Sequence, residues 1–271
     1  MPTYRLTVEY DGTRYRGWQE QKNANTVAGE LRRVLESFCG ERLELAGSGR
    51  TDAGVHALAQ VAHIRTAGEL DLRLLLREVN GRLPQDIHLL DCARAPDRFH
   101  ARHSASARSY VYQVSRRRTA FAKRFVWWVA DPLDVERMRR AAKGLLGKKD
   151  FAAFCEKPEE QSSTLVVVES AEIREEGALL LVRLVASHFL WRMVRRVVGT
   201  LVRVGTGELS EQQFTLLVNA GEASLVGADP SRFTAPPSGL FLERVVYPGE
   251  APLGGLVAPV PVAAALPLEK R

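Results

Sequence analysis

Strand-like and helix-like hydrophobic patterns follow one another in a particular order through the first 92 residues. Alternating apolar and polar side chains indicate half-buried strands, whereas apolar side chains three or four residues apart indicate amphipathic helices. The patterns lie, in order, at residues 4–10, 27–38, 43–45, 60–64, 72–79 and 87–92. Asn25-Thr26 and Gly40 bound the first helix pattern, and Gly81 and Pro84 stop the second. This strand–helix–strand–strand–helix–strand order predicts a ferredoxin-like unit.

The second half of the chain repeats that order with additions. Strand patterns at 110–114 and 125–129, a hairpin around Gly177 and a strand at 239–247 accompany helix patterns at 132–146, 188–204 and 211–219. We therefore predict an α+β fold of two tandem ferredoxin-like units, with mainly antiparallel sheets and an active-site cleft between them. The predicted domains are residues 1–105 and 106–248, followed by a flexible tail at 249–271 rich in Pro and Ala.

Composition limits the class of protein. The 271 residues are 45% hydrophobic and 26% charged, which is typical of soluble globular chains and sufficient for one large or two modest domains. No apolar run approaches the length of a membrane span, and the first residues lack a signal-peptide pattern. The three cysteines form no CxxC pair, which argues against a disulfide framework or a zinc ribbon. We expect a cytoplasmic protein with no membrane association.

The charge balance favours a polyanionic partner. Lys and Arg number 38 against 32 Asp and Glu, for a net charge of +6. Only seven of these cations are Lys, and Arg binds phosphate bidentately and stacks on bases. A preference for Arg also arises from genomic base composition, so charge alone leaves a nucleic-acid partner open.

A glycine-rich loop is the strongest candidate for a functional site. Gly47, Gly49 and Gly54 surround Asp52 and relax the backbone constraints on a loop that presents a carboxylate. The spacing of Gly49 and Gly54 is that of a phosphate-binding Walker loop, but Val55-His56 replace the required Lys-Ser/Thr pair. A turn or helix-capping aspartate is the structural alternative.

This loop resembles the signature of the TruA family of tRNA pseudouridine synthases. The matching run is Gly49-Arg-Thr-Asp-Ala-Gly-Val-His56, and the resemblance extends over roughly residues 4–247. Further similar segments are Glu9–Gly12 with Gly17–Gln19, Asn80–Pro84, Phe99–Arg102, Ser104–Tyr110, Met193–Arg195 with Val198-Gly199, and Gly239–Leu242. The segment Gln161–Leu165 departs from the family pattern because it lacks an arginine after Ser162.

The resemblance implies conversion of uridine to pseudouridine at positions 38, 39 and 40 of the tRNA anticodon stem-loop by a homodimer. It implies no metal and no cofactor. Asp52 would be the nucleophile, attacking either C1′ of the ribose or C6 of the uracil. Arg195 would pair with Asp52, Arg50 would face the base or a phosphate, and Tyr110 would lie against the uracil. Strand parity does not separate Tyr110 from Tyr112, since both would face the same side.

Other polar and aromatic groups receive weaker interpretations. Three basic runs are candidates for phosphate contacts, although each also fits a solvated surface: Arg116–Arg118, Lys123-Arg124 and Lys148-Lys149. His56 and His63 are interpreted as structural, and Trp127-Trp128 as core or subunit interface.

Two other functions fit parts of the sequence. A noncatalytic pair of RRM-like units would need an aromatic RNP1 motif, which the sequence lacks. An acid–base hydrolase would need a second carboxylate near Asp52. Glu44 precedes the loop on a strand and Asp71 begins a different helix, so no paired carboxylate is evident.

Overall fold

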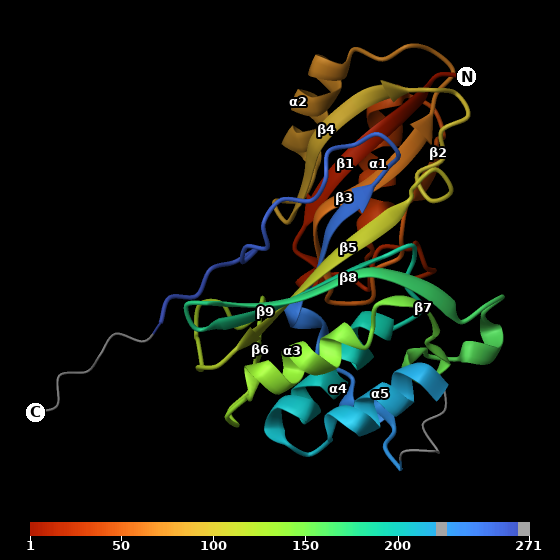
Figure 1. Cartoon of the computed structure of the whole chain (residues 1–271). Helices are drawn as coiled ribbons and strands as arrows, with labels where there is room; N and C mark the ends of the chain where they lie inside the picture. The colour runs from red at the N-terminus through yellow and green to blue at the C-terminus, as the bar shows by residue number, and fades with distance from the viewer. Residues whose placement is uncertain (221–226, 265–271) are drawn as a thin grey trace, which may run out of the picture. The chain divides into compact units, whose positions relative to one another are not determined.

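The structure is a computed structural model that describes residues 1–220 and 227–264. Contacts within the chain divide it into unit 1, residues 1–108 and 241–251, and unit 2, residues 109–240 and 252–271. The predicted boundary after residue 105 lies close to this division. The segment 241–248, however, groups with unit 1 and not with the second half of the chain. The described residues form five α-helices and mostly antiparallel strands, which is a mixed α and β fold (Figure 1).

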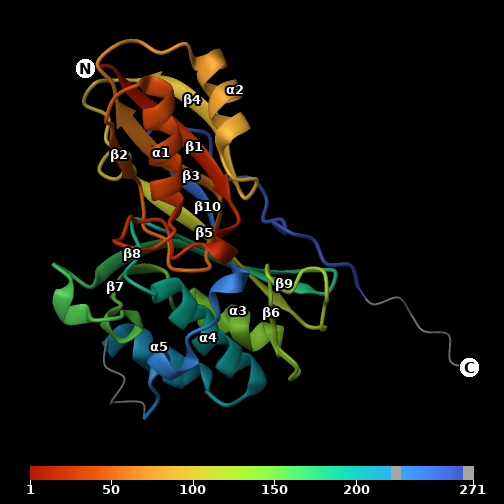
Figure 2. The same cartoon turned by 180° about the vertical axis from the view of Figure 1, so that it is seen from behind.

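Unit 1 is built on a sheet with the strand order β4-β1-β3-β10, and β2 pairs with the distal part of β3. β1 is antiparallel to both of its neighbours, β2 is antiparallel to β3, and β10 is parallel to β3 where Phe241 meets His56. Helices α1 and α2 contact each other beside this sheet (Figure 2). The elements are β1 (Thr3–Tyr10), α1 (Val27–Cys39), β2 (Glu44–Gly47), β3 (His56–Arg65), α2 (Leu72–Arg82), β4 (Ile87–Ala95) and β10 (Leu240–Val246).

The ends of α1 and α2 follow from local chemistry. The Thr26 hydroxyl accepts the Gly29 N–H at 3.3 Å to begin α1, and Gly40 ends it with a φ of 70°. Both predicted ends of α1 are confirmed. Helix α2 passes through Gly81, so the predicted stop at that glycine is wrong. It ends before Leu83, because the residue before a proline avoids the helical region.

Unit 2 contains strands in the order β5-β9-β8-β7, with β6 parallel to β5. Every residue of β9 is buried, and β8 forms an antiparallel hairpin with it. Helices α3, α4 and α5 pack against one another on one side of these strands (Figures 1 and 2). The elements are β5 (Ala107–Ser115, whose first two residues belong to unit 1), β6 (Trp127–Trp128), α3 (Val135–Lys143), β7 (Gly147–Asp150), β8 (Leu165–Glu176), β9 (Leu179–Ala186), α4 (Met193–Thr206) and α5 (Glu211–Ala220).

Two helices of unit 2 are shorter at their starts than predicted. Helix α3 begins after Asp134 and not at Pro132, because the Asp134 carboxylate caps it by accepting the Arg137 N–H at 3.0 Å. Helix α4 begins at Met193 and not at His188. The backbone before it bonds elsewhere: the Ser187 N–H donates to the Val167 carbonyl, and the Trp191 carbonyl accepts the Glu156 N–H.

The end of the chain lies against unit 2, whereas the sequence predicts a flexible tail from residue 249 onward. The Arg174 guanidinium donates to the Leu256 carbonyl at 2.6 Å, and the Ala178 N–H donates to the Val262 carbonyl at 3.2 Å. The side chains of Leu256 and Val262 are buried. Two apolar side chains therefore anchor a segment rich in Pro and Ala, and residues 265–271 lie outside the described residues.

Candidate active site

The loop between β2 and β3 contains Asp52 and is fixed at its start by β3. The Ser48 N–H donates to the Val61 carbonyl at 2.7 Å, and the Gln60 side-chain amide donates to the Gly49 carbonyl at 2.9 Å. Gln60 is fully buried. A buried amide that bonds a loop carbonyl restricts the backbone just before Arg50-Thr51-Asp52.

A second segment, from the end of β1 to the start of α1, fixes the middle of the loop. The Thr51 and Tyr10 hydroxyls are 2.8 Å apart, and the Thr51 carbonyl accepts the Trp18 N–H at 3.1 Å. The Gly54 N–H donates to the Tyr15 carbonyl at 3.3 Å. Burial raises the pKa of Tyr10 well above its ordinary value, so this phenol stays protonated at neutral pH. The loop is held from two directions.

The side chains of the loop differ in exposure. Thr51 is buried against Tyr10, Arg50 is exposed, and Asp52 is half-buried. The Val55 N–H donates to the Asp52 carbonyl at 3.2 Å, which closes a tight turn after the aspartate. A carboxylate on an anchored backbone that remains partly accessible has the arrangement required of a nucleophile or a general base.

Close approach at two glycines makes this anchoring possible. A Cβ on Gly17 would lie 2.4 Å from the Thr51 carbonyl oxygen, and Gly17 has a φ of 97°. A Cβ on Gly47 would lie 2.4 Å from the Trp18 indole nitrogen. Sequence analysis singles out Gly47 and Gly54 but assigns no such role to Gly17. Its position before Trp18 is a signal only once the two segments are known to touch.

Gly17→Ala is therefore expected to damage the active-site loop. Its Cβ would displace the Thr51 carbonyl, and the positive φ adds strain of about 1–2 kcal/mol. We expect a lower melting temperature and activity reduced by on the order of tenfold, since small misplacements of a reacting group are costly. Gly40→Ala, also at positive φ but with no atom within 4 Å of its Cβ, is the matched control. Equal activity in the two variants would contradict the prediction.

The histidines after the loop lie in the core of unit 1. His56 stacks on Phe241 with ring centroids 4.7 Å apart. Its Nδ1 lies 3.1 Å from both the Gly12 N–H nitrogen and an Asp11 oxygen, so it accepts from one or donates to the other. His63 is fully buried, and its Nδ1 accepts the Ala101 N–H at 3.2 Å. These contacts fit the structural interpretation of both residues.

His63 makes the stability of the protein dependent on pH. Burial, together with the neighbouring His100 and Arg65, lowers the pKa of His63 to about 4. Since the unfolded chain binds this proton near pH 6.5, stability from His63 is complete above that pH and is lost as pH falls toward 4. We expect the free energy of unfolding to drop by about 1–3 kcal/mol over that interval through this group.

Denaturant melts from pH 7 to pH 4 measure this effect. His63→Asn, which keeps an acceptor for the Ala101 N–H, should show a shallower dependence on pH than the wild type. His88→Asn changes an exposed histidine on β4 and should leave the dependence unaltered. Parallel pH profiles for wild type and His63→Asn would refute the assignment.

Unit 2 separates the two tyrosines that strand parity leaves equivalent. Tyr112 is fully buried, its hydroxyl donates to the Pro236 carbonyl at 2.7 Å, and burial raises its pKa well above the ordinary value. Tyr110 retains 7% exposure and meets Phe189 edge to face, with ring centroids 5.0 Å apart. Tyr112 is thus a core residue with its hydroxyl committed to the backbone.

Two neighbouring arginines of α4 have different surroundings. Arg196 is buried, bonds the Cys155 carbonyl at 2.5 Å and forms an ion pair with Glu156. Arg195 is half-buried, and its Nε donates to the Ala235 carbonyl at 2.7 Å. The bond fixes the direction of the Arg195 guanidinium. Arg196 therefore has a structural role that sequence periodicity does not distinguish from that of Arg195.

The predicted site residues fall in both units: Arg50 and Asp52 in unit 1, Tyr110 and Arg195 in unit 2. Within the described ranges, no group of three or more His, Cys, Asp or Glu side chains is arranged to hold a metal ion. None of the helices in residues 1–220 and 227–264 combines the length and apolar character needed to cross a membrane.

Comparison with known proteins decides the family. The family model for tRNA pseudouridine synthase matches residues 6–104 and 141–248, well over half of the chain. The chain belongs to the TruA family of tRNA pseudouridine synthases. It is 36% identical over 244 residues to tRNA pseudouridine synthase A of Thermoanaerobacter sp. strain X514, covering 89% of this chain and 98% of the relative. It is 39% identical over 254 residues to tRNA pseudouridine synthase A of Maricaulis maris, covering 93% and 100%.

This synthase is an enzyme that isomerises uridine in tRNA, so the RRM-like and hydrolase alternatives are set aside. Asp52 and Arg195 lie inside the segments that match the family model, whereas Tyr110 lies between them. Among solved structures, a Cbf5-Nop10-Gar1 complex is similar with a TM-score of 0.33 and 11% identity, covering 73% of this synthase and 45% of that chain. A similarity this weak has no bearing on the assignment.

Proposed function

We propose that this synthase modifies uridines 38, 39 and 40 of the tRNA anticodon stem-loop, with Asp52 as the nucleophile. The supporting observation is the loop itself. A half-buried carboxylate stands on a backbone held by Tyr10, Trp18 and Gln60, in a segment that matches the family model and resembles its signature. The choice of uridines rests on the resemblance.

The reaction needs a nucleophile that also leaves. The N1–C1′ bond of uridine breaks, C5 bonds to C1′, the C5 proton is lost and N1 gains a proton. A carboxylate attacks C1′ or C6 and departs again, so the net reaction requires no further reactant. We assign Asp52 to this step and Arg195 to stabilising its negative charge. Tyr110 is assigned to the face of the uracil, and Arg50 to the base or an adjacent phosphate.

Topology supports a ferredoxin-like origin for the scaffold. In unit 1 the order β1-α1-β2-β3-α2-β4, with β1 between β3 and β4 and β2 next to β3, is that of a ferredoxin-like unit. We propose that unit 2 derives from a second copy, extended by β6, β7 and α5. The resemblance also supports a homodimer that works in the cytoplasm, and sedimentation analysis would test the oligomeric state.

An assay on unmodified tRNA tests the function directly. A transcript with uridines at 38, 39 and 40 is incubated with the synthase, and pseudouridine is located by carbodiimide labelling and primer extension. We expect label at these positions and none when they are replaced by cytidine. Label at other uridines would refute the proposed positions. Product at 38–40 with Asp52→Asn would refute the nucleophile.

A further inference from the structure

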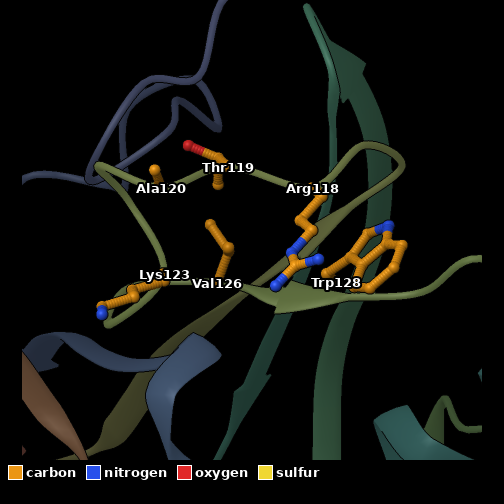
Figure 3. A pocket seen from close by; sticks show the side chains of 6 residues that line it. All are labelled: Arg118, Thr119, Ala120, Lys123, Val126 and Trp128. Atoms are coloured by element: carbon orange, nitrogen blue, oxygen red, sulfur yellow. The ribbon is translucent and has the colours of Figure 1, made fainter.

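A loop of unit 2 between β5 and β6 encloses a hollow of about 640 Å³. It is lined by Arg118, Thr119, Ala120, Lys123, Val126 and Trp128. Figure 3 shows the Arg118 side chain beside the Trp128 ring, with Lys123 on the opposite side of the hollow. The loop lies in residues 105–140, between the two segments that match the family model. The function assigned above makes no use of it.

The loop has a one-sided charge. Residues 116–124 contain five cations, and no Asp or Glu occurs from residue 116 through residue 130. Arg116 is neutralised by Glu175 at 2.5 Å, and Arg117 donates to the Ala263 carbonyl at 2.9 Å. No ion pair joins Arg118 or Lys123 to a carboxylate within residues 1–220 and 227–264. The two cations that line the hollow are thus available for an anion.

The aromatic groups of this loop face outward. The Arg118 guanidinium lies 5.8 Å from the centre of the Trp128 ring, and the ring is 45% exposed. Phe121, at the tip of the same loop, is 98% exposed. An arginine stacked on a ring keeps its in-plane N–H groups for a phosphate, and exposed rings offer faces on which bases stack. Cations combined with exposed rings fit a nucleic acid.

The hollow is held in shape from inside. The Gln113 side-chain amide donates to the Phe125 carbonyl at 2.8 Å, and the Val129 N–H donates to the Ser115 carbonyl at 3.0 Å. Ala122 and Val126 belong to a buried cluster that includes Leu256 and Val262 of the chain's last described segment. A braced loop loses little conformational entropy on binding, so its contacts contribute fully to affinity.

We propose that this hollow binds the sugar-phosphate backbone of the tRNA substrate: Arg118 and Lys123 hold a phosphate, and the exposed rings contact an adjacent nucleoside. The inference rests on the proposed function for the identity of the RNA. It assigns a binding site outside the residues given to the isomerisation. Because phosphate contacts are independent of base identity, the site adds affinity without selecting a particular uridine.

Charge reversal with a matched control tests the site. Lys123→Glu is compared with Lys143→Glu, an exposed lysine on α3 of the same unit, by anisotropy titration of unmodified tRNA at several salt concentrations. We expect Lys123→Glu to weaken binding by on the order of tenfold and to lower the salt slope by about 1, and Arg118→Glu/Lys123→Glu to lower it by about 2. In turnover assays KM for tRNA should rise more than kcat falls. Equal affinity for the two lysine variants would overturn the proposal.

Further variants distinguish the ring contacts and other occupants. Arg118→Lys keeps the charge but loses the planar fork, and Trp128→Ala removes the ring, so both should weaken tRNA binding several-fold. Wild-type affinity in both would refute the stacked arrangement. If Phe121→Ser alters the sedimentation of the free protein and leaves affinity per dimer unchanged, the surface is an interface between copies and the proposal fails. Loss of affinity in Lys123→Glu, with no pseudouridine from the wild type, would sustain this site and refute the proposed function.

Discussion

Replacing Asp52 with Asn is expected to lower pseudouridine formation by on the order of 10⁴-fold or more, because no other group on this loop can form the covalent bond. The amide is nearly isosteric, and the bonds that Tyr10, Trp18 and Tyr15 make to the loop involve Thr51 and Gly54 and not the Asp52 side chain. The fold and the affinity for tRNA should therefore remain close to wild type. Single-turnover formation of pseudouridine and tRNA titration measure the two quantities separately.

The control for Asp52→Asn is Asp91→Asn, which removes the same charge from an exposed position on β4. It should leave the rate unchanged. A substantial fraction of wild-type turnover in Asp52→Asn would refute the nucleophile. If tRNA binding fell as far as the rate did, the carboxylate would act in binding, since a nucleophile contributes little to affinity for the ground state.

Tyr110→Phe and Tyr112→Phe are expected to have opposite effects on rate and stability. If the Tyr110 hydroxyl helps remove the C5 proton, its loss should slow turnover by about 100-fold while tRNA binds normally. Tyr112→Phe leaves the Pro236 carbonyl without its donor in a buried setting, which should cost about 1–2 kcal/mol of stability and leave the rate close to wild type.

Single-turnover rates and thermal melts of both variants measure this contrast. Equal rates for Tyr110→Phe and Tyr112→Phe would remove any special role for the Tyr110 hydroxyl. Tyr110→Ala tests the stacking role, because it removes the ring that meets Phe189. A wild-type rate in Tyr110→Ala would show that the ring is not needed against the uracil.

Elements with strong local signals could be predicted from the sequence. Helix α1 begins and ends where Thr26 and Gly40 predict, because a hydroxyl cap and a left-handed glycine act within a few residues of the chain. Strand β7 was missed, since Gly147–Asp150 has no alternating apolar residues and is a strand only through its pairing with β8. The start of α4 was also missed, because backbone bonds to β8 and to Glu156 hold residues 187–191 outside the helix.

The sequence by itself determined the family, the loop that contains Asp52 and the alternation of strands and helices in each half. These depend on residue types at short spacing, and short spacing is visible in a linear chain. Only the tertiary structure decided that Gly17 must be small, that Tyr112 and Arg196 are structural, and that Leu256 and Val262 pack into unit 2. Each of these depends on contact between segments distant in sequence, and composition and periodicity carry no record of such contacts.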